Sequence, residues 1–109
     1  MLKAHSLFPE IASTADAETF TTLFEKVGVK IERIDSHGQA SPEGFWYDQP
    51  QDEWVLLFKG SAVLEIADQP PLTLKAGDHL LIPAHLRHRV ASTSADALWL
   101  AVHVSPPSA

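Results

Sequence analysis

The sequence predicts an all-β domain, a barrel or sandwich with one amphipathic helix packed on its outside. Short apolar segments follow one another at close, regular spacing between Val29 and Val104 and are separated by turn residues, which is typical of such folds. The chain has 109 residues, the size of one domain. Hydrophobic residues make up 45% and charged residues 20%, a composition that favours a folded core over disorder.

The helix is expected at residues 14–27. Its apolar positions follow the i, i+3, i+4, i+7 pattern of one helical face: Phe20, Leu23, Phe24 and Val27. Asp16 suits the positive N-terminal end of a helix, and Gly28 suits its C-terminal end. Residues 1–28 are therefore predicted to form an N-terminal segment whose helix packs on the barrel, with Phe24 buried at the centre of the stripe.

The strands are expected after Gly28. Their apolar residues either alternate with polar ones or, at Trp54–Phe58, fill both faces of the strand. Glycine and proline mark the turns between them. The expected strands are residues 29–34, 45–49, 54–58, 62–66, 72–74, 79–82, 87–92 and 97–104. The barrel is thus predicted to span residues 29–104, and residues 105–109 have the composition of a disordered tail.

Charge and cysteine content narrow the classes of partner. The formal net charge is -6, and an acidic surface repels phosphate backbones, so a nucleic-acid partner is not expected. No segment approaches the run of about 20 apolar residues that spans a bilayer, so a membrane partner is not expected either. The chain has no cysteine, which fits a reducing compartment, and we expect a cytoplasmic protein.

Two spaced motifs resemble those of the cupin family. Glu53 and Gly60 match the end of the first family motif, G-x5-H-x-H-x3/4-E-x6-G. Gly77, Pro83 and His88 match the second, G-x5-P-x-G-x2-H-x3-N. The resemblance covers Val29 to Val104. It implies a small single-domain cupin, a jelly-roll barrel that is open at one end.

The resemblance also implies a divalent metal held by three histidines and one glutamate at the barrel mouth. Tyr47 and Gln49 stand at the positions of two of those histidines, so only Glu53 and His88 remain of the family's ligands. His85 replaces the glycine that follows the motif proline. One hypothesis is that zinc, manganese, iron or nickel binds Glu53 and His88, with Gln49 and His85 as further candidate ligands. The alternative is a buried, metal-free hydrogen-bonded pair.

Tyr47, Gln49 and Glu53 are separated by even spacings, so a regular strand would place them on one side. The family register points that side into the barrel, where it meets His88. These four residues are the predicted ligand pocket, suited to a small polar or anionic molecule.

Other side chains near the motifs allow two interpretations. Arg87 and Arg89 could clamp an anionic group, but pairing with surface acids or with solvent is the simpler interpretation. His103 is expected to make local hydrogen bonds within a strand. Trp54 lies on the strand face opposite Glu53, where aromatic residues favour packing under another sheet or a homodimer interface.

Three functions remain open at this point. The first is a small-molecule-binding cupin without catalysis. The second is a metal-dependent isomerase, dioxygenase or lyase that acts on a small polar or anionic substrate. The third is a structural or interaction protein whose pocket is vestigial. The loss of two family histidines lowers the second, and the polar residues retained at the mouth lower the third.

Overall fold

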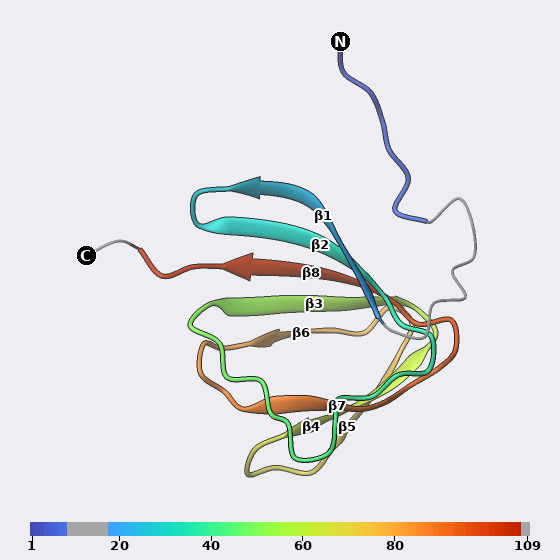
Figure 1. The fold of residues 1–109 in the computed structure, drawn as a ribbon, viewed down its shortest axis with the longest axis vertical. Helices are drawn as coiled ribbons and strands as arrows, with labels where there is room; N and C mark the ends of the chain where they lie inside the picture. The colour runs from blue at the N-terminus through green and yellow to red at the C-terminus, as the bar shows by residue number, and fades with distance from the viewer. Residues whose placement is uncertain (9–17, 108–109) are drawn as a thin grey trace.

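The protein consists of two antiparallel β-sheets that face each other, seen one above the other in Figure 1. The structure is a computed structural model that describes residues 1–8 and 18–107. The larger sheet has the strand order β1-β2-β8-β3-β6, and the smaller has the order β5-β4-β7. The strands are β1 Thr19–Lys26, β2 Val29–Asp35, β3 Asp52–Lys59, β4 Ser61–Ile66, β5 Leu72–Lys75, β6 His79–Ile82, β7 His88–Thr93 and β8 Leu98–Val104. This arrangement confirms the predicted all-β fold class.

The core lies between the two sheets and is built by strand alternation. Val55 and Leu57 of β3 point inward and are 5% and 0% exposed, while Ala101 of the neighbouring β8 is 0% exposed. The smaller sheet contributes apolar side chains such as Leu64 from the opposite side. Burial of these apolar surfaces is the main force that holds the sheets together.

The predicted helix is wrong over Thr19–Lys26, which form strand β1. This strand pairs antiparallel with β2, to which a two-residue turn joins it. The first part of the expected helix, residues 14–17, lies outside the described residues. None of the described residues forms a helix long and apolar enough to cross a membrane.

A register shift in β1 explains the misleading pattern. Between Thr22 and Phe24 the pairing with β2 slips by one residue. Because side chains alternate along a strand, this bulge places Phe20 and Phe24 on opposite faces of the sheet. The i, i+4 spacing therefore does not mark one buried stripe. Phe20 and Phe24 are 54% and 47% exposed, so the expected burial of Phe24 is also wrong.

The segment expected as a strand at residues 45–49 is not regular. Tyr47 makes an isolated antiparallel bridge with His88, in which Tyr47 N donates to His88 O at 2.7 Å and His88 N donates to Tyr47 O at 3.2 Å. The bridge attaches this loop to the first residue of β7. It therefore fixes the position of Tyr47 beside His88 without extending the sheet.

The outer face of the larger sheet is apolar. Trp54 and Leu56 are partly buried there, on the face opposite Glu53, as strand alternation predicts. Phe58 is 41% exposed, and the ring of Phe8 packs edge-on against it with centroids 5.2 Å apart. That a second copy of the chain covers this face stays a prediction.

Candidate functional site

A small pocket of about 90 Å³ lies between the two sheets and is lined by residues of both. Glu53 stands at the start of β3 and His88 at the start of β7, while His103 lies near the end of β8. Antiparallel pairing brings these strand ends together, since Glu53 is the register partner of His103. The pocket is lined by Glu18, Phe20, Glu32, Ile34, Tyr47, Gln49, Glu53, Val55, Leu64, Ile82, His88, Trp99 and His103.

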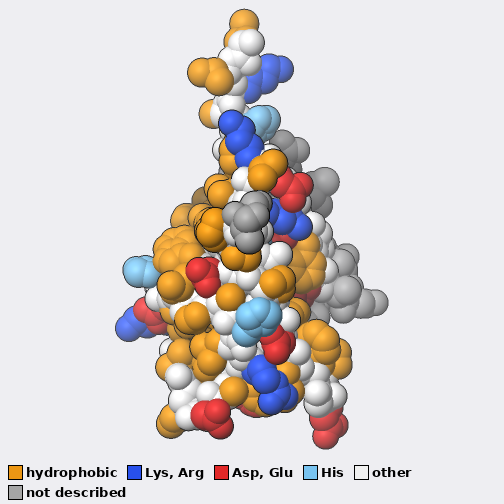
Figure 2. Space-filling model, turned by 90° about the vertical axis from the view of Figure 1, so that its left-hand side faces the viewer, with side chains coloured by type: hydrophobic (Ala, Val, Ile, Leu, Met, Phe, Trp, Pro, Cys, Tyr) orange, Lys and Arg blue, Asp and Glu red, His pale blue; other side chains and the backbone are white. Residues whose placement is uncertain are grey.

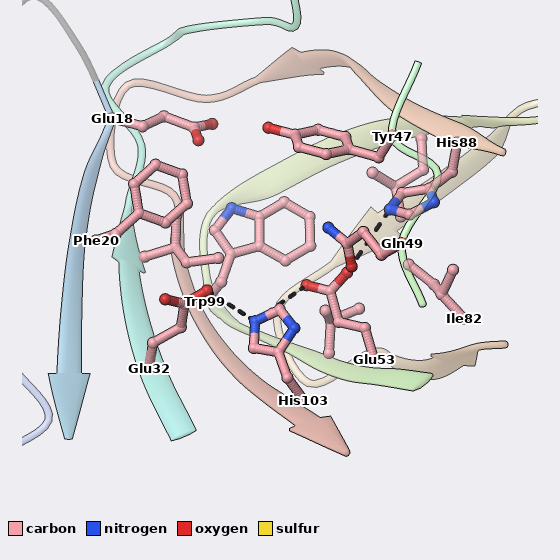
Figure 3. A pocket seen from close by; sticks show the side chains of 13 residues that line it. Glu18, Phe20, Glu32, Tyr47, Gln49, Glu53, Ile82, His88, Trp99 and His103 are labelled. Carbon is pink, nitrogen blue, oxygen red and sulfur yellow. Dashed lines mark hydrogen bonds and ion pairs between the residues drawn. The ribbon is translucent and has the colours of Figure 1, made fainter. Parts of the chain in front are cut away.

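Two glutamates and two histidines alternate along one wall of this pocket (Figure 3). His88 Nε2 lies 3.6 Å from Glu53 Oε1, and Glu53 Oε2 lies 3.9 Å from His103 Nε2. The same His103 nitrogen lies 2.8 Å from Glu32 Oε1. Glu32, Glu53 and His88 are all less than 9% exposed. Each carboxylate thus has an imidazole beside it, which is how buried charge is tolerated.

His88 is held so that it carries a proton readily. Its Nδ1–H donates to Leu86 O at 2.8 Å, which leaves Nε2 facing Glu53. Burial by itself lowers the pKa of His88, but the hydrogen bond and charge of Glu53 together with the Leu86 carbonyl outweigh it and raise the pKa above 6.5. Protonated His88 therefore has an acceptor near each ring nitrogen: Leu86 O at Nδ1 and Glu53 Oε1 at Nε2.

Tyr47 and Glu18 face each other at the far side of the pocket (Figure 3). The Tyr47 ring stacks on His88 with centroids 5.4 Å apart. Burial raises the pKa of Tyr47, and the charges of Glu18, Glu53 and Glu32 raise it further, so the phenol stays neutral. Burial also raises the pKa of Glu18, although its hydrogen bond from Ser36 Oγ, at 3.1 Å, opposes this.

Gln49 offers an acceptor that the protein itself does not use. Its Oε1 atom is buried and has no hydrogen-bond partner among the described residues. A buried acceptor without a donor costs about 1–3 kcal/mol. A ligand that donates a hydrogen bond at this position would remove that cost.

The structure brings Tyr47, Gln49, Glu53 and His88 to one pocket, while His85 does not line it. The His85 side chain is 69% exposed, and its Nδ1 lies 2.8 Å from Asp48 Oδ1. That the four pocket residues bind a ligand stays a prediction.

Sequence reasoning missed three ionisable residues of the pocket: Glu18, Glu32 and His103. Glu32 and His103 were detectable in principle, because each is polar at an inward position of its strand, two residues from an inward apolar one. Glu18 was hidden by the incorrect helix. His103 was expected to make local hydrogen bonds, but its hydrogen bond goes to Glu32 on the neighbouring β2, 71 positions away in sequence and inside the pocket.

Arg89 stands away from the pocket and has structural partners. It donates from Nη1 to Glu65 Oε1 and from Nη2 to Ser41 O, both at 3.0 Å. The Arg87 guanidinium lies 5.3 Å from the centre of the Trp46 ring. Among the described residues that line the pocket there is no lysine or arginine, whereas three are glutamates. This pocket does not offer an anion clamp.

Comparisons with known proteins agree with the geometry. Residues 32–103 match the family model described as "Cupin domain". The chain is a cupin. No curated protein matches this cupin.

Solved structures resemble this cupin over most of its length. A Ralstonia eutropha protein named "putative mannose-6-phosphate isomerase" is 50% identical, with a TM-score of 0.90, over 96% of this chain and 100% of that one. A cupin superfamily protein from Desulfitobacterium hafniense is 21% identical, with a TM-score of 0.75, over 88% of this chain and 84% of that one. An RmlC-like cupin from Shewanella frigidimarina is 14% identical, with a TM-score of 0.73, over 96% of this chain and 91% of that one. The last two show the fold alone.

The donors in this cupin do not fit the family's metal. Glu53 and His88 are the two family ligands that remain, and the raised pKa of Tyr47 disfavours a phenolate. Gln49 supplies only a neutral oxygen. His103 Nε2 already lies 2.8 Å from Glu32 Oε1. Within residues 1–8 and 18–107, no group of three or more histidine, aspartate or glutamate side chains is arranged to hold an ion.

His85, which stands where the second motif has glycine, has a backbone conformation that glycine favours. Its φ is 63°, in the left-handed region that is unfavourable for a residue with a Cβ atom. His85→Gly and His85→Ala both remove the contact with Asp48 and differ in the Cβ atom. We expect His85→Gly to be more stable than His85→Ala by about 1 kcal/mol in urea denaturation. Equal stabilities would show that this turn carries no strain.

The raised pKa of His88 predicts a pH-dependent stability. The folded protein binds this proton more tightly than the unfolded chain, so the stabilisation is complete below pH 6.5 and is lost as pH rises through the folded-state pKa. The free energy of unfolding should therefore fall between about pH 6 and pH 8, and fall less in His88→Gln. Urea denaturation at both pH values tests this. Glu18, whose pKa is also raised from 4.5, is present in both the wild type and His88→Gln. Its contribution to the pH dependence therefore cancels when the two proteins are compared.

Proposed function

We propose that this cupin binds a small, uncharged, hydroxyl-rich molecule, a sugar or polyol, in the barrel pocket. The observation that carries the proposal is the polar wall in which glutamates alternate with histidines, together with the unused acceptor of Gln49. A hydroxyl group can donate to a carboxylate or amide oxygen and accept from an imidazolium or phenol. The wall offers both kinds of partner within one small space.

The rest of the pocket suits the carbon skeleton of such a ligand. Trp99 is 5% exposed and is fixed by its Nε1–H, which donates to Ser36 Oγ at 3.2 Å. Ile34, Val55 and Leu64 extend this apolar surface. An apolar floor with a few placed polar groups is the usual composition of a small-molecule site. A ligand with C–H groups on one side and hydroxyls on the other would contact both surfaces.

Charge disfavours an anionic group inside the pocket. Glu18, Glu32 and Glu53 all line it, without lysine or arginine among the described lining residues. A phosphate placed there would be repelled by like charges at low effective dielectric. The sequence left both a polar and an anionic ligand open. The charge of the lining residues favours a neutral group inside the barrel pocket.

Isothermal titration calorimetry with mannose, glucose, fructose and mannitol tests the proposal. At least one should bind the wild type, and Glu53→Gln, which keeps the side-chain shape and removes the charge, should weaken it by about 10–100-fold. Glu43→Gln is the control, because Glu43 is exposed and does not line the pocket. Lack of binding by the whole set, or equal affinity in both variants, would contradict the proposal.

A second candidate function is the isomerisation of an aldose to a ketose. It is favoured by the 50% identity to the Ralstonia eutropha protein and by the two histidine–glutamate pairs at one pocket. In this reaction a base takes the proton from C2 and returns it to C1, while a second proton moves from O2 to O1. Glu53 could act as the base, and the His88 imidazolium could act as the acid at oxygen.

Proton NMR in D2O separates the two candidates. An isomerase would convert mannose 6-phosphate to the ketose with deuterium entering at C1, and Glu53→Gln would abolish the incorporation. A binding protein would leave the sugar unchanged even while it binds it.

A further inference from the structure

The outer face of the larger sheet carries a cluster of apolar side chains. Strand pairing sets Trp54 of β3 between Val102 of β8 and Leu81 of β6. Because side chains alternate along a strand, these residues point away from the pocket, which lies on the other face of the same sheet. All members of the cluster keep exposed surface, and Leu81 is 57% exposed. The outer cluster is Trp54, Leu56, Phe58, Leu81, Leu100 and Val102. A contiguous apolar patch of this kind marks an interaction surface.

The charged groups beside the outer cluster already have partners within the chain. Arg33 of β2 donates to Asp35 Oδ2 at 3.0 Å and to Leu7 O at 3.2 Å. Asp52, at the start of β3, accepts from Ala84 N at 2.8 Å. The chain has a formal net charge of -6, so two copies repel each other unless they meet where carboxylates are paired. The outer face meets that condition and can lie against itself around a two-fold axis.

The N-terminal arm, residues 1–6, is attached to this same face. Leu7, which follows the arm, is held through its carbonyl by Arg33, and the ring of Phe8 packs edge-on against Phe58 of the outer cluster. Beyond these contacts the arm stands clear of both sheets in two perpendicular views (Figure 1, Figure 2). A second molecule placed on the outer face would therefore lie beside the root of the arm.

The arm does not close onto its own sheet. A hollow of about 640 Å³ lies between residues 5–7 and the side chains of Thr22, Leu23 and Arg33. The exposed fractions of Met1 and Leu2 are 114% and 100%, so neither side chain is covered by the chain to which it belongs. The arm thus offers apolar surface that only another molecule can bury.

The outer face by itself is smaller than a stable interface. Its five strands are about 24 Å across, and about six residues of each give a length of about 20 Å, so the face covers about 500 Å². Stable complexes bury about 800 Å² of each partner. An arm that lies against the second molecule supplies the difference.

We propose that two copies of this chain stack through the outer faces of their larger sheets, and that the arm of each copy lies against the other copy. A second copy suits this face better than a different protein, because selection of a different partner needs complementary charges and the outer cluster presents none. The association leaves the barrel pocket open, since the pocket lies on the opposite face of the sheet. It goes beyond the proposed function and does not depend on the ligand.

Sedimentation equilibrium at increasing protein concentration tests the stacked face. The wild type should show twice the chain mass of 11.9 kDa. The test variant is Phe58→Glu/Leu81→Glu, and the matched control is Phe45→Glu/Val27→Glu, which adds the same charge at exposed apolar positions outside the outer cluster. We expect the test variant to weaken association by more than about 100-fold, because it sets carboxylates of two acidic copies against each other, and the control to stay within about threefold.

Both residues of the test variant are exposed, so its far-UV circular dichroism should match that of the wild type. If the double substitution nevertheless disturbs the fold, Leu81→Glu compared with Val27→Glu repeats the test with one added charge. The expected loss of affinity is then about 10-fold.

Nuclear magnetic resonance of a mixed sample tests the arm. The chain has no cysteine, so Ala4→Cys takes a single nitroxide label at an exposed position of the arm. This labelled protein, without ¹⁵N, is mixed with ¹⁵N-labelled wild type. We expect the nitroxide to broaden amide signals of β3 and β8 in the other copy more strongly than those of Thr73 and Ser92 on the smaller sheet. The same sample with the nitroxide reduced is the control.

Four results would overturn the inference. A mass of one chain at all concentrations would refute the association. A mass above two chains would refute a closed pair. A dimer that survives in the test variant would place the interface elsewhere. Broadening that occurs only when label and ¹⁵N are on the same chain would place the arm on its own copy. Each of these results leaves the proposed function standing, because no pocket residue is changed.

Discussion

Replacing Leu57 with alanine should lower the free energy of unfolding by about 3–5 kcal/mol. Leu57 is 0% exposed and lies on β3, in the core between the two sheets. The substitution removes buried apolar atoms and leaves a cavity that the flanking strands cannot close, because both sheets are pinned by their hydrogen-bond ladders. Urea denaturation followed by tryptophan fluorescence measures the change.

Phe24→Ala is the matched comparison, since it deletes a larger side chain. Phe24 is 47% exposed on β1, so its loss should cost no more than about 1 kcal/mol. The smaller deletion is thus expected to have the larger effect. If Phe24→Ala proved as costly as Leu57→Ala, β1 would have to be covered by something that the isolated chain does not show.

Replacing Gly60 with alanine should be nearly as damaging, with a loss of about 2–5 kcal/mol. Gly60 joins β3 to β4 with a φ of 86°. A Cβ atom there would lie 2.4 Å from Ser94 Oγ and 2.9 Å from Ala97 Cα. Ser94 Oγ cannot simply turn away, because it accepts from Ser61 N at 2.9 Å and donates to Asp96 Oδ1 at 2.8 Å.

Gly77→Ala separates backbone strain from crowding. Gly77 has a φ of 96°, but a Cβ atom there would meet nothing within 4 Å. Its substitution should therefore cost about 1–2 kcal/mol, the strain alone. Thermal and urea unfolding of both variants tests the difference. Equal losses would mean that Ser94 and Ala97 yield to the added methyl group.

Glu53, Gly60, Gly77 and His88 predicted the jelly-roll barrel through their resemblance to the cupin motifs, whereas the spacing of the strands predicted a barrel or a sandwich. Each of these positions is set by local geometry: a strand start or a turn that needs a positive φ. Such requirements are readable from a single sequence because they depend on nearby residues. The alternation of the later strands was readable for the same reason, since one face meets the core.

The predictions that were wrong or missing concern features that depend on contacts between residues distant in sequence. β1 is a strand because β2 pairs with it, and the bulge at Thr22 disguises its period as that of a helix. Glu32 and His103 form part of the pocket because they are two strands' inward residues at one sheet end, 71 positions apart. Neither the pairing of β1 with β2 nor the meeting of Glu32 and His103 produces a pattern among residues that are close in sequence.

The pocket was therefore predicted in part. Tyr47, Gln49, Glu53 and His88 meet there, although the regular strand assumed for the first two does not exist. The backbone bridge between Tyr47 and His88 takes its place. The acidic character of the pocket was not predictable, because it depends on Glu18 and Glu32, which the fold brings to Glu53 from distant parts of the sequence.

The bulge in β1 also bears on how the protein behaves in concentrated solution. β1 is the border of the larger sheet, and a straight border strand offers unpaired amide and carbonyl groups to other chains. The slip between Thr22 and Phe24 interrupts the regular spacing of those groups. The opposite border, β6, is four residues long and is followed at once by Pro83. Neither border of the larger sheet is therefore a good template for fibre growth, despite the apolar outer face of that sheet.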